Sequence, residues 1–239
     1  MLTLMIFTLF SSEAQLKKGN KMIGASIGSV FFNSGSTEVT YPAPTLGYQT
    51  FNSSFGLNIK PSVGWFISDN TITGMSININ PAHQKIWYEV NGNKYREDIT
   101  RSFAIGAGGF LRSYFKSQTS FVPFGQAGLN IGFNSIKTEG FLYNASDKSI
   151  YDGKSTGGFL IGGSISLGTT KFINSFIGLD FYGAYNFSYT KNTNISTTLI
   201  DLGNDGSIDQ TEIREPTTKF TNHGFELGAG FQIFFERKK

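Results

Sequence analysis

The chain has 239 residues, with 29 Gly, 24 Phe, 10 Tyr and 2 Trp, and it contains no Cys. The lack of Cys excludes disulfide scaffolds, Cys-ligated zinc, iron–sulfur clusters and thiol nucleophiles. Charged residues make up only 15% of the chain, and a net charge of +3 is too small to indicate nucleic-acid binding. High Gly and Phe content with few charges is typical of a β-rich protein, and the length fits one barrel-sized domain.

Residues 1–14 have the pattern of a secretory signal peptide. An apolar run from Leu2 to Phe10 precedes a small-residue cleavage pattern in which Ser12 and Ala14 lie before the cut. No Lys or Arg precedes the run, which a signal peptide whose true start lies upstream would explain. The alternative to a signal peptide is a frayed apolar N-terminus. Residues 15–21 are expected to form a short periplasmic lead. No later segment reaches the roughly 18 apolar residues of a transmembrane helix.

Eight later segments alternate apolar and small or polar residues with the period of a β-strand. In the last of them, Phe225, Leu227 and Phe231 fall on one face. Glu226, Gly228 and Gly230 fall on the other face. The eight segments lie near residues 22–32, 55–67, 71–80, 103–115, 121–134, 157–168, 175–190 and 225–235.

The connectors between these segments alternate in length. Those near 68–70, 116–120 and 169–174 are short, whereas 33–54, 81–98, 135–156 and 191–218 are long. Short turns on one rim and long loops on the other are typical of outer-membrane barrels, and an even strand number places both termini at the periplasmic rim. The predicted fold is therefore an all-β, eight-stranded antiparallel up-and-down transmembrane β-barrel over residues 22–235. Short periplasmic turns and long extracellular loops connect its strands, and a basic tail follows at 236–239.

The two faces of the segments differ in a way that suits a bilayer. One face is large, aromatic and free of charge, as lipid contact requires, and the other is rich in Gly, Ser and Asn, which let a narrow lumen close. We expect an interfacial girdle of aromatic side chains near the strand ends. Its candidates are Phe31, Trp65, Phe115, Phe133, Phe187, Phe234 and Phe235.

The last strand, from Gly224 to Phe235, alternates and ends in aromatic residues. In this respect the chain resembles the small eight-stranded bacterial outer-membrane β-barrels of the OmpA-transmembrane and OmpX kind, over about residues 22–235. The resemblance implies localisation in the bacterial outer membrane and insertion by the barrel assembly machinery, which reads such terminal strands. The chain departs from the pattern because four residues, 236–239, follow the aromatic end.

Four ionisable residues fall on the inward face: Lys60, Arg112, Asp180 and Glu226. Counted from the short-turn rim, Arg112 and Asp180 lie low and the other two lie higher. Because an unpaired buried charge is costly, we predict an ion-pair network in the lumen. Such a network either plugs and orients the barrel or lines a narrow polar path for ions, since an eight-stranded interior is nearly filled by side chains.

The last long connector contains an acidic segment that partly fits a calcium loop. Its candidate ligands are Asp201, Asp205, Ser207, Asp209 and Glu212, with Gly206 at the turn position. Gly203 stands where the pattern requires another oxygen ligand. The segment therefore indicates either a weak calcium site, the one cofactor considered, or a solvated acidic turn.

The sequence offers little sign of an enzyme. Neither of the two histidines, His83 and His223, has a nucleophilic residue at a sequence spacing that indicates a catalytic pair. We therefore predict a non-enzymatic barrel whose four surface loops have structural or interaction roles, with outer-membrane lipids and a protein as partners and no nucleic acid. The alternatives are a small pore or transport-associated barrel, an outer-leaflet lipid-modifying enzyme that uses one of these histidines, and a soluble lipocalin-like carrier.

Overall fold

The computed structural model describes residues 16–39, 47–117, 119–144 and 147–236. The predicted signal peptide and the end of the basic tail lie outside the described residues. Within them, no helix has the length and apolar character needed to cross a bilayer. The strands are β1 (Lys21–Val39), β2 (Tyr48–Ser68), β3 (Thr71–Val90), β4 (Asn93–Tyr114), β5 (Phe121–Asn144), β6 (Asp147–Phe172), β7 (Ile177–Asp201), β8 (Gln210–Arg214) and β9 (Thr217–Phe235).

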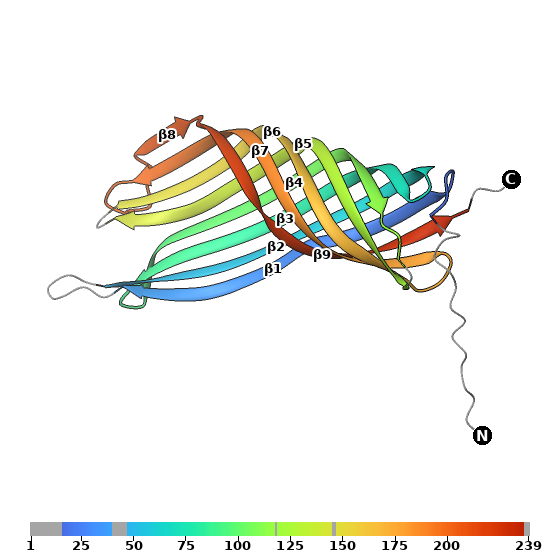
Figure 1. Cartoon of the computed structure of the whole chain (residues 1–239). Coiled ribbons are helices and arrows are strands. Elements are labelled where there is room, and N and C mark those ends of the chain that lie inside the picture. The colour runs from blue at the N-terminus through green and yellow to red at the C-terminus, as the bar shows by residue number, and fades with distance from the viewer. Residues whose placement is uncertain (1–15, 40–46, 118, 145–146, 237–239) are drawn as a thin grey trace, which may run out of the picture.

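Eight long strands form a closed ring (Figure 1). Each strand from β1 to β7 pairs antiparallel with the next, and β9 pairs with both β7 and β1. The short strand β8 pairs with β7 above the ring. The start of β1 and the end of β9 lie at the same end of the barrel, where Lys21 pairs with Phe235 (Figure 1). The predicted eight-stranded up-and-down barrel is therefore confirmed, with one additional short strand.

The long connectors are largely strand, which differs from the loops that the sequence predicted. β3 and β4 pair from Thr71 and Ser113 up to Val90 and Asn93. The hairpin turns at Asn91 and Gly92, whose φ angles are 49° and 74°. Positive φ at both central residues is the geometry of a tight type I′ turn. Polar residues occupy both faces of these extensions, although backbone pairing continues. The alternation of apolar and polar residues by which a half-buried strand is recognised in a sequence is therefore missing.

The outer surface of the barrel is apolar over the height of a bilayer. On β9, Phe225 and Leu227 are 90% and 83% exposed, and Phe231 and Phe235 lie on the same face. The outward apolar residues of β9 lie between positions 225 and 235. At roughly 3.3 Å per residue and a tilt of about 40°, these positions cover about 25 Å, the height of the apolar band of an outer-membrane barrel.

Apolar side chains fill the periplasmic half of the lumen. Phe124 and Phe234 are only 1% and 2% exposed there, so Phe234 is not part of the outer girdle where the sequence placed it. The N-terminal lead closes the end, because Leu16 is buried and its carbonyl accepts the N–H of Asn70 at 2.9 Å. The cluster comprises Leu16, Met22, Phe66, Ile72, Phe110, Tyr114, Val122, Phe124, Phe172 and Phe234.

Close packing in this half predicts that alanine substitution at two neighbouring glycines changes the stability of the barrel to different extents. A Cβ on Gly74 would lie 2.3 Å from the carbonyl oxygen of Val63 and 2.4 Å from the Phe110 ring, whereas a Cβ on Gly109 would have its nearest neighbour at 3.8 Å. We expect Gly74→Ala to lower the free energy of unfolding by roughly 1–3 kcal/mol through overpacking. Gly109→Ala should leave it nearly unchanged. Urea unfolding of the barrel in lipid vesicles measures both, and equal effects would contradict this packing.

Candidate functional site

The seam between β1 and β9 is paired over only part of its length. Cα partners run from Lys21 with Phe235 to Ile27 with Ala229, while β1 continues to Val39 and β9 begins at Thr217. Beyond the paired part the two strands diverge toward the extracellular end (Figure 1). Both other neighbours remain paired, since β1 follows β2 to Val39 and β9 follows β7 from Thr217. The wall of the barrel is thus open along one seam.

A β-bulge in β1 lies where the seam opens. The register with β2 shifts between Ile27 and Val30, which places one extra residue on β1. A bulge bends its strand and increases the local twist, so it directs β1 away from β9. The bulge also changes which residues of β1 face outward, from odd-numbered positions before it to even-numbered positions after it. Val30 and Phe32 are 61% and 75% exposed, while Phe31 lines the lumen.

The inward position of Phe31 corrects its assignment to the outer girdle. Its ring covers Gly56, where a Cβ would lie 2.2 Å from the ring. The sequence signal for the bulge is the Gly28–Ser29 pair, which separates apolar Ile27 from apolar Val30 by three positions where a regular strand requires two or four. Phe31 therefore forms the β1 side of the lumen where the seam opens.

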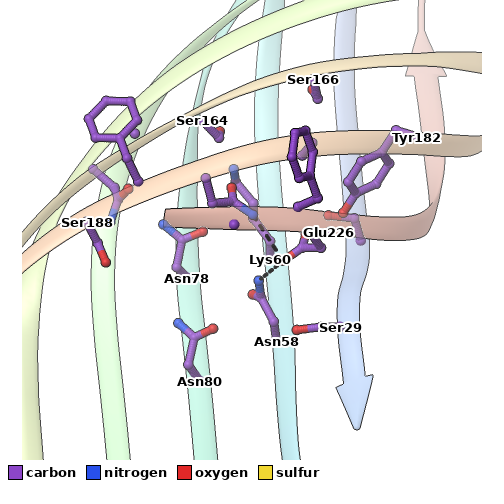
Figure 2. A pocket seen from close by; sticks show the side chains of 18 of the residues that line it. Ser29, Asn58, Lys60, Asn78, Asn80, Ser164, Ser166, Tyr182, Ser188 and Glu226 are labelled. Carbon is purple, nitrogen blue, oxygen red and sulfur yellow. Dashed lines mark hydrogen bonds between the residues drawn. The ribbon is translucent and has the colours of Figure 1, made fainter. Parts of the chain in front are cut away.

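A cavity of about 640 Å³ fills the lumen above the apolar cluster. Half of the residues that line it carry amide or hydroxyl side chains, and Asn58, Asn78, Asn80, Ser164, Ser166 and Ser188 are labelled in Figure 2. The Asn58 Oδ1 is buried and has no hydrogen-bond partner among the described residues, so an entering polar group could satisfy it. Phe225 and Gly224 of β9 also line the cavity, although the Phe225 side chain is on the outer face. The cavity therefore reaches the open seam.

Arg112 lines this cavity and forms a buried ion pair with Asp180. Arg112 Nη1 lies 2.8 Å from Asp180 Oδ2, and Arg112 Nε donates to Gln126 Oε1 at 2.7 Å. Asp180 also accepts the hydroxyl of Thr170 at 2.6 Å and the side-chain amide of Gln232. The guanidinium stacks 4.1 Å from the centroid of the Phe124 ring. The lower pair predicted from the sequence is thus formed, with further hydrogen bonds to both charged groups.

The upper two charges are not joined in the same way. Glu226 accepts the side-chain amide of Asn58 at 3.1 Å (Figure 2). It also accepts the side-chain amide of Asn186 at 3.4 Å. Lys60 lines the cavity, and no ion pair links it to Glu226 within the described residues. Strands of a tilted barrel are staggered, so a count along each strand does not give a common height. Glu226 instead lies against β1, where a Cβ on Gly28 would be 2.1 Å from its Oε1.

The acidic segment of the last hairpin forms a turn closed by its own carboxylates. Asp201 accepts the N–H groups of Asp205 and Gly206, each at 3.0 Å. Asp209 accepts the N–H of Leu202 at 2.7 Å. Glu212 pairs with Arg214, and Asp205 accepts the N–H of Ser207. No group of three or more metal-ligating side chains forms in the described part of the chain, so the calcium site stays a prediction.

The two histidines lie on different strands of the barrel wall. His83 of β3 pairs in register with Phe55 and Arg101. His223 of β9 lies at the mouth of the cavity, with its ring centroid 6.3 Å from that of Tyr185. β1 and β2 separate β9 from β3 in the ring, so the structure does not bring the two histidines together.

The chain is an outer-membrane β-barrel, because a closed ring with an apolar band of this height fits a bilayer and its first and last strands begin and end at one rim. No protein-family model matches it, and no curated protein matches it. Among solved structures, the outer membrane protein OprG from Pseudomonas aeruginosa is 13% identical, with 92% of this chain and 98% of that chain covered and a TM-score of 0.42.

Two further solved structures are similar to the chain. Neisserial surface protein A is 14% identical, with 90% of this chain and 97% of that chain covered and a TM-score of 0.34. The outer membrane protease OmpT from Escherichia coli is 13% identical over the same shares, with a TM-score of 0.32. At such identities the likeness concerns the fold alone.

The buried ion pair predicts a non-additive pair of substitutions. Asp180→Leu leaves Arg112 buried without its partner and should lower the free energy of unfolding by about 3–5 kcal/mol. Arg112→Met combined with Asp180→Leu removes both charges and should recover most of that loss. Urea unfolding in lipid vesicles provides the double-mutant cycle. Additive losses in the double variant would show that the two charges do not stabilise one another.

A second prediction concerns pH at the extracellular end of β3 and β4. Hydrogen bonds from Lys94 at 2.5 Å and then from Lys85 lower the pKa of Glu97 below its ordinary value of 4.5. A lowered folded-state pKa stabilises the hairpin above the unfolded pKa, and this stabilisation is lost as pH falls through the folded pKa. Hydrogen exchange of the hairpin should therefore show lower protection at pH about 3 than at pH about 7. Glu97→Gln should remove that difference, and its persistence would contradict the assignment.

Proposed function

We propose that the barrel passes small amphipathic molecules between the cell surface and the outer leaflet of the membrane, through the open seam between β1 and β9. The single observation that carries the proposal is the end of β1–β9 pairing at Ile27 and Ala229, while both strands continue. A cavity of about 640 Å³ lies behind this opening and is large enough for a ligand of drug-like size.

The opening begins inside the apolar band of the barrel. Phe225 and Leu227 flank it on β9, and Val30 and Phe32 flank it on β1, all four strongly exposed on the outer face. An apolar tail can pass between these side chains without leaving an apolar environment. A polar group of the same molecule can be hydrogen-bonded by the asparagine and serine side chains of the cavity.

The direction of passage follows from the closed periplasmic half. The apolar cluster and the Arg112–Asp180 pair fill the lumen below the cavity, and the N-terminal lead packs Leu16 against them. A molecule that enters from the surface therefore leaves sideways into the bilayer. We accordingly expect little ion conductance in a planar bilayer, in contrast to a pore whose conductance responds to substitution of Lys60 or Arg112.

A reversible lock across the seam tests this function. The chain has no Cys, so Phe32→Cys combined with Phe225→Cys introduces the only thiols, and a bis-methanethiosulfonate linker long enough to span the diverging strands can join them where a direct disulfide cannot. We expect joining to reduce uptake of an amphipathic fluorescent probe through lipopolysaccharide-containing outer membranes to the level of membranes without the barrel. Reduction of the disulfides that attach the linker should restore uptake.

The matched control joins strands where they are already paired. Ile23→Cys with Ile233→Cys lies in the paired part of the same seam and should leave uptake unchanged after treatment with the same linker. Unchanged uptake in the joined Phe32–Phe225 variant would exclude passage through the seam. That outcome would favour the other interpretation, in which the surface hairpins serve structural roles or bind a partner protein.

A further inference from the structure

A belt of five exposed cationic side chains lies above the apolar band on its extracellular side. On each of β4, β5, β6, β7 and β9, the first charged residue on the outer face above the band is Lys or Arg. On β4, for example, Arg101 follows Phe103, and on β7 Lys191 follows Tyr189. The belt, named here the cationic belt, consists of Arg101, Lys137, Lys154, Lys191 and Lys219.

The strand register places like charges directly beside one another in this belt. Arg101 pairs with Lys137, and Lys137 pairs in turn with Lys154. Lys191 pairs with Lys219 in the same way. Like charges directly opposite on neighbouring strands are destabilising, so the arrangement favours a bound anion.

The acids near the belt neutralise only part of it. Glu139, two positions above Lys137, forms ion pairs with Arg101 and with Lys137, the latter at 2.9 Å. The hydrogen bond of Lys137 to Glu139, together with the charge of Asp152, raises the pKa of Lys137. Lys154, Lys191 and Lys219 are exposed and form no ion pair within the described residues. Three cations at the boundary of the apolar band therefore remain open to an external anion.

We propose that the cationic belt binds the phosphate groups of anionic lipid in the outer leaflet. Side chains at the edge of the apolar band lie at the depth of lipid head groups, and cationic side chains there are attracted to lipid phosphates. A Lys ammonium binds a phosphate as a point charge, so a row of them suits several head groups around the barrel. The belt spans β4 to β9 and leaves β1 and β2 without a cation at this level, on the side where the seam opens.

The test uses the full chain folded in detergent and diphosphorylated lipid A as the probe, with native mass spectrometry counting bound lipid. We expect Lys154→Gln, Lys191→Gln and Lys219→Gln together to weaken retention of lipid A at least tenfold. Dephosphorylated lipid A should bind the unaltered barrel at least tenfold more weakly than lipid A. Replacement of the same three residues by Arg should retain binding, because the charge is kept.

A charge-matched control removes three cations from the opposite rim: Lys17→Gln, Lys18→Gln and Lys116→Gln. This variant should retain lipid A as the unaltered barrel does. An equal loss in both triple variants, or equal binding of the dephosphorylated lipid, would overturn the proposal. Displacement of lipid A by an equal concentration of inorganic phosphate would show a site for free phosphate in place of lipid. Unboiled-gel mobility confirms that every variant is folded.

Discussion

The main-chain hydrogen bonds that close the ring constrain everything else in this molecule. In a bilayer each backbone polar group needs a partner, so a strand-built membrane protein has to close on itself. Here closure at β1 and β9 is limited to the pairs from Lys21–Phe235 to Ile27–Ala229. Beyond them, the backbone groups of each strand that face the seam have no ladder partner on the other. The asparagine and serine side chains that line the cavity behind the seam provide a polar environment in which water can satisfy such groups.

The interior is divided into two halves that serve this arrangement. The periplasmic half is an apolar cluster capped by the Arg112–Asp180 pair and its hydrogen bonds, and it stabilises the closed part of the ring. The extracellular half is polar and open, with Glu226 held by two amides beside the bulge of β1. Stability is thus concentrated where all strands are paired. The β1 bulge separates this region from the part that we propose to be functional.

Much of the fold was predictable from the sequence, because period-2 alternation on a charge-free aromatic face is imposed directly by lipid. The length of the strands was not predictable from the sequence. Their extensions beyond the bilayer are polar on both faces and therefore lack the contrast between an apolar and a polar face. The Asn91–Gly92 pair is a strong hairpin signal that shortens the second expected loop to a tight turn. The Arg112–Asp180 pair followed from the cost of buried charge, whereas the Glu226 contacts depend on strand stagger. The open seam depends on the bulge at Gly28–Ser29 and on the end of β1–β9 pairing at Ile27 and Ala229. The alternation within a single strand does not show where its pairing with another strand ends.

The central claim is that the wall of the barrel is open between β1 and β9 within the apolar band. Its most direct test is solution NMR of the barrel in lipid nanodiscs, with nuclear Overhauser contacts measured between the backbone amide protons of the two strands. Contacts are expected between residues 21–27 and 229–235, and none between residues 28–39 and 217–228. A ladder of contacts that continued above Ile27 and Ala229 would show a closed wall and contradict the account.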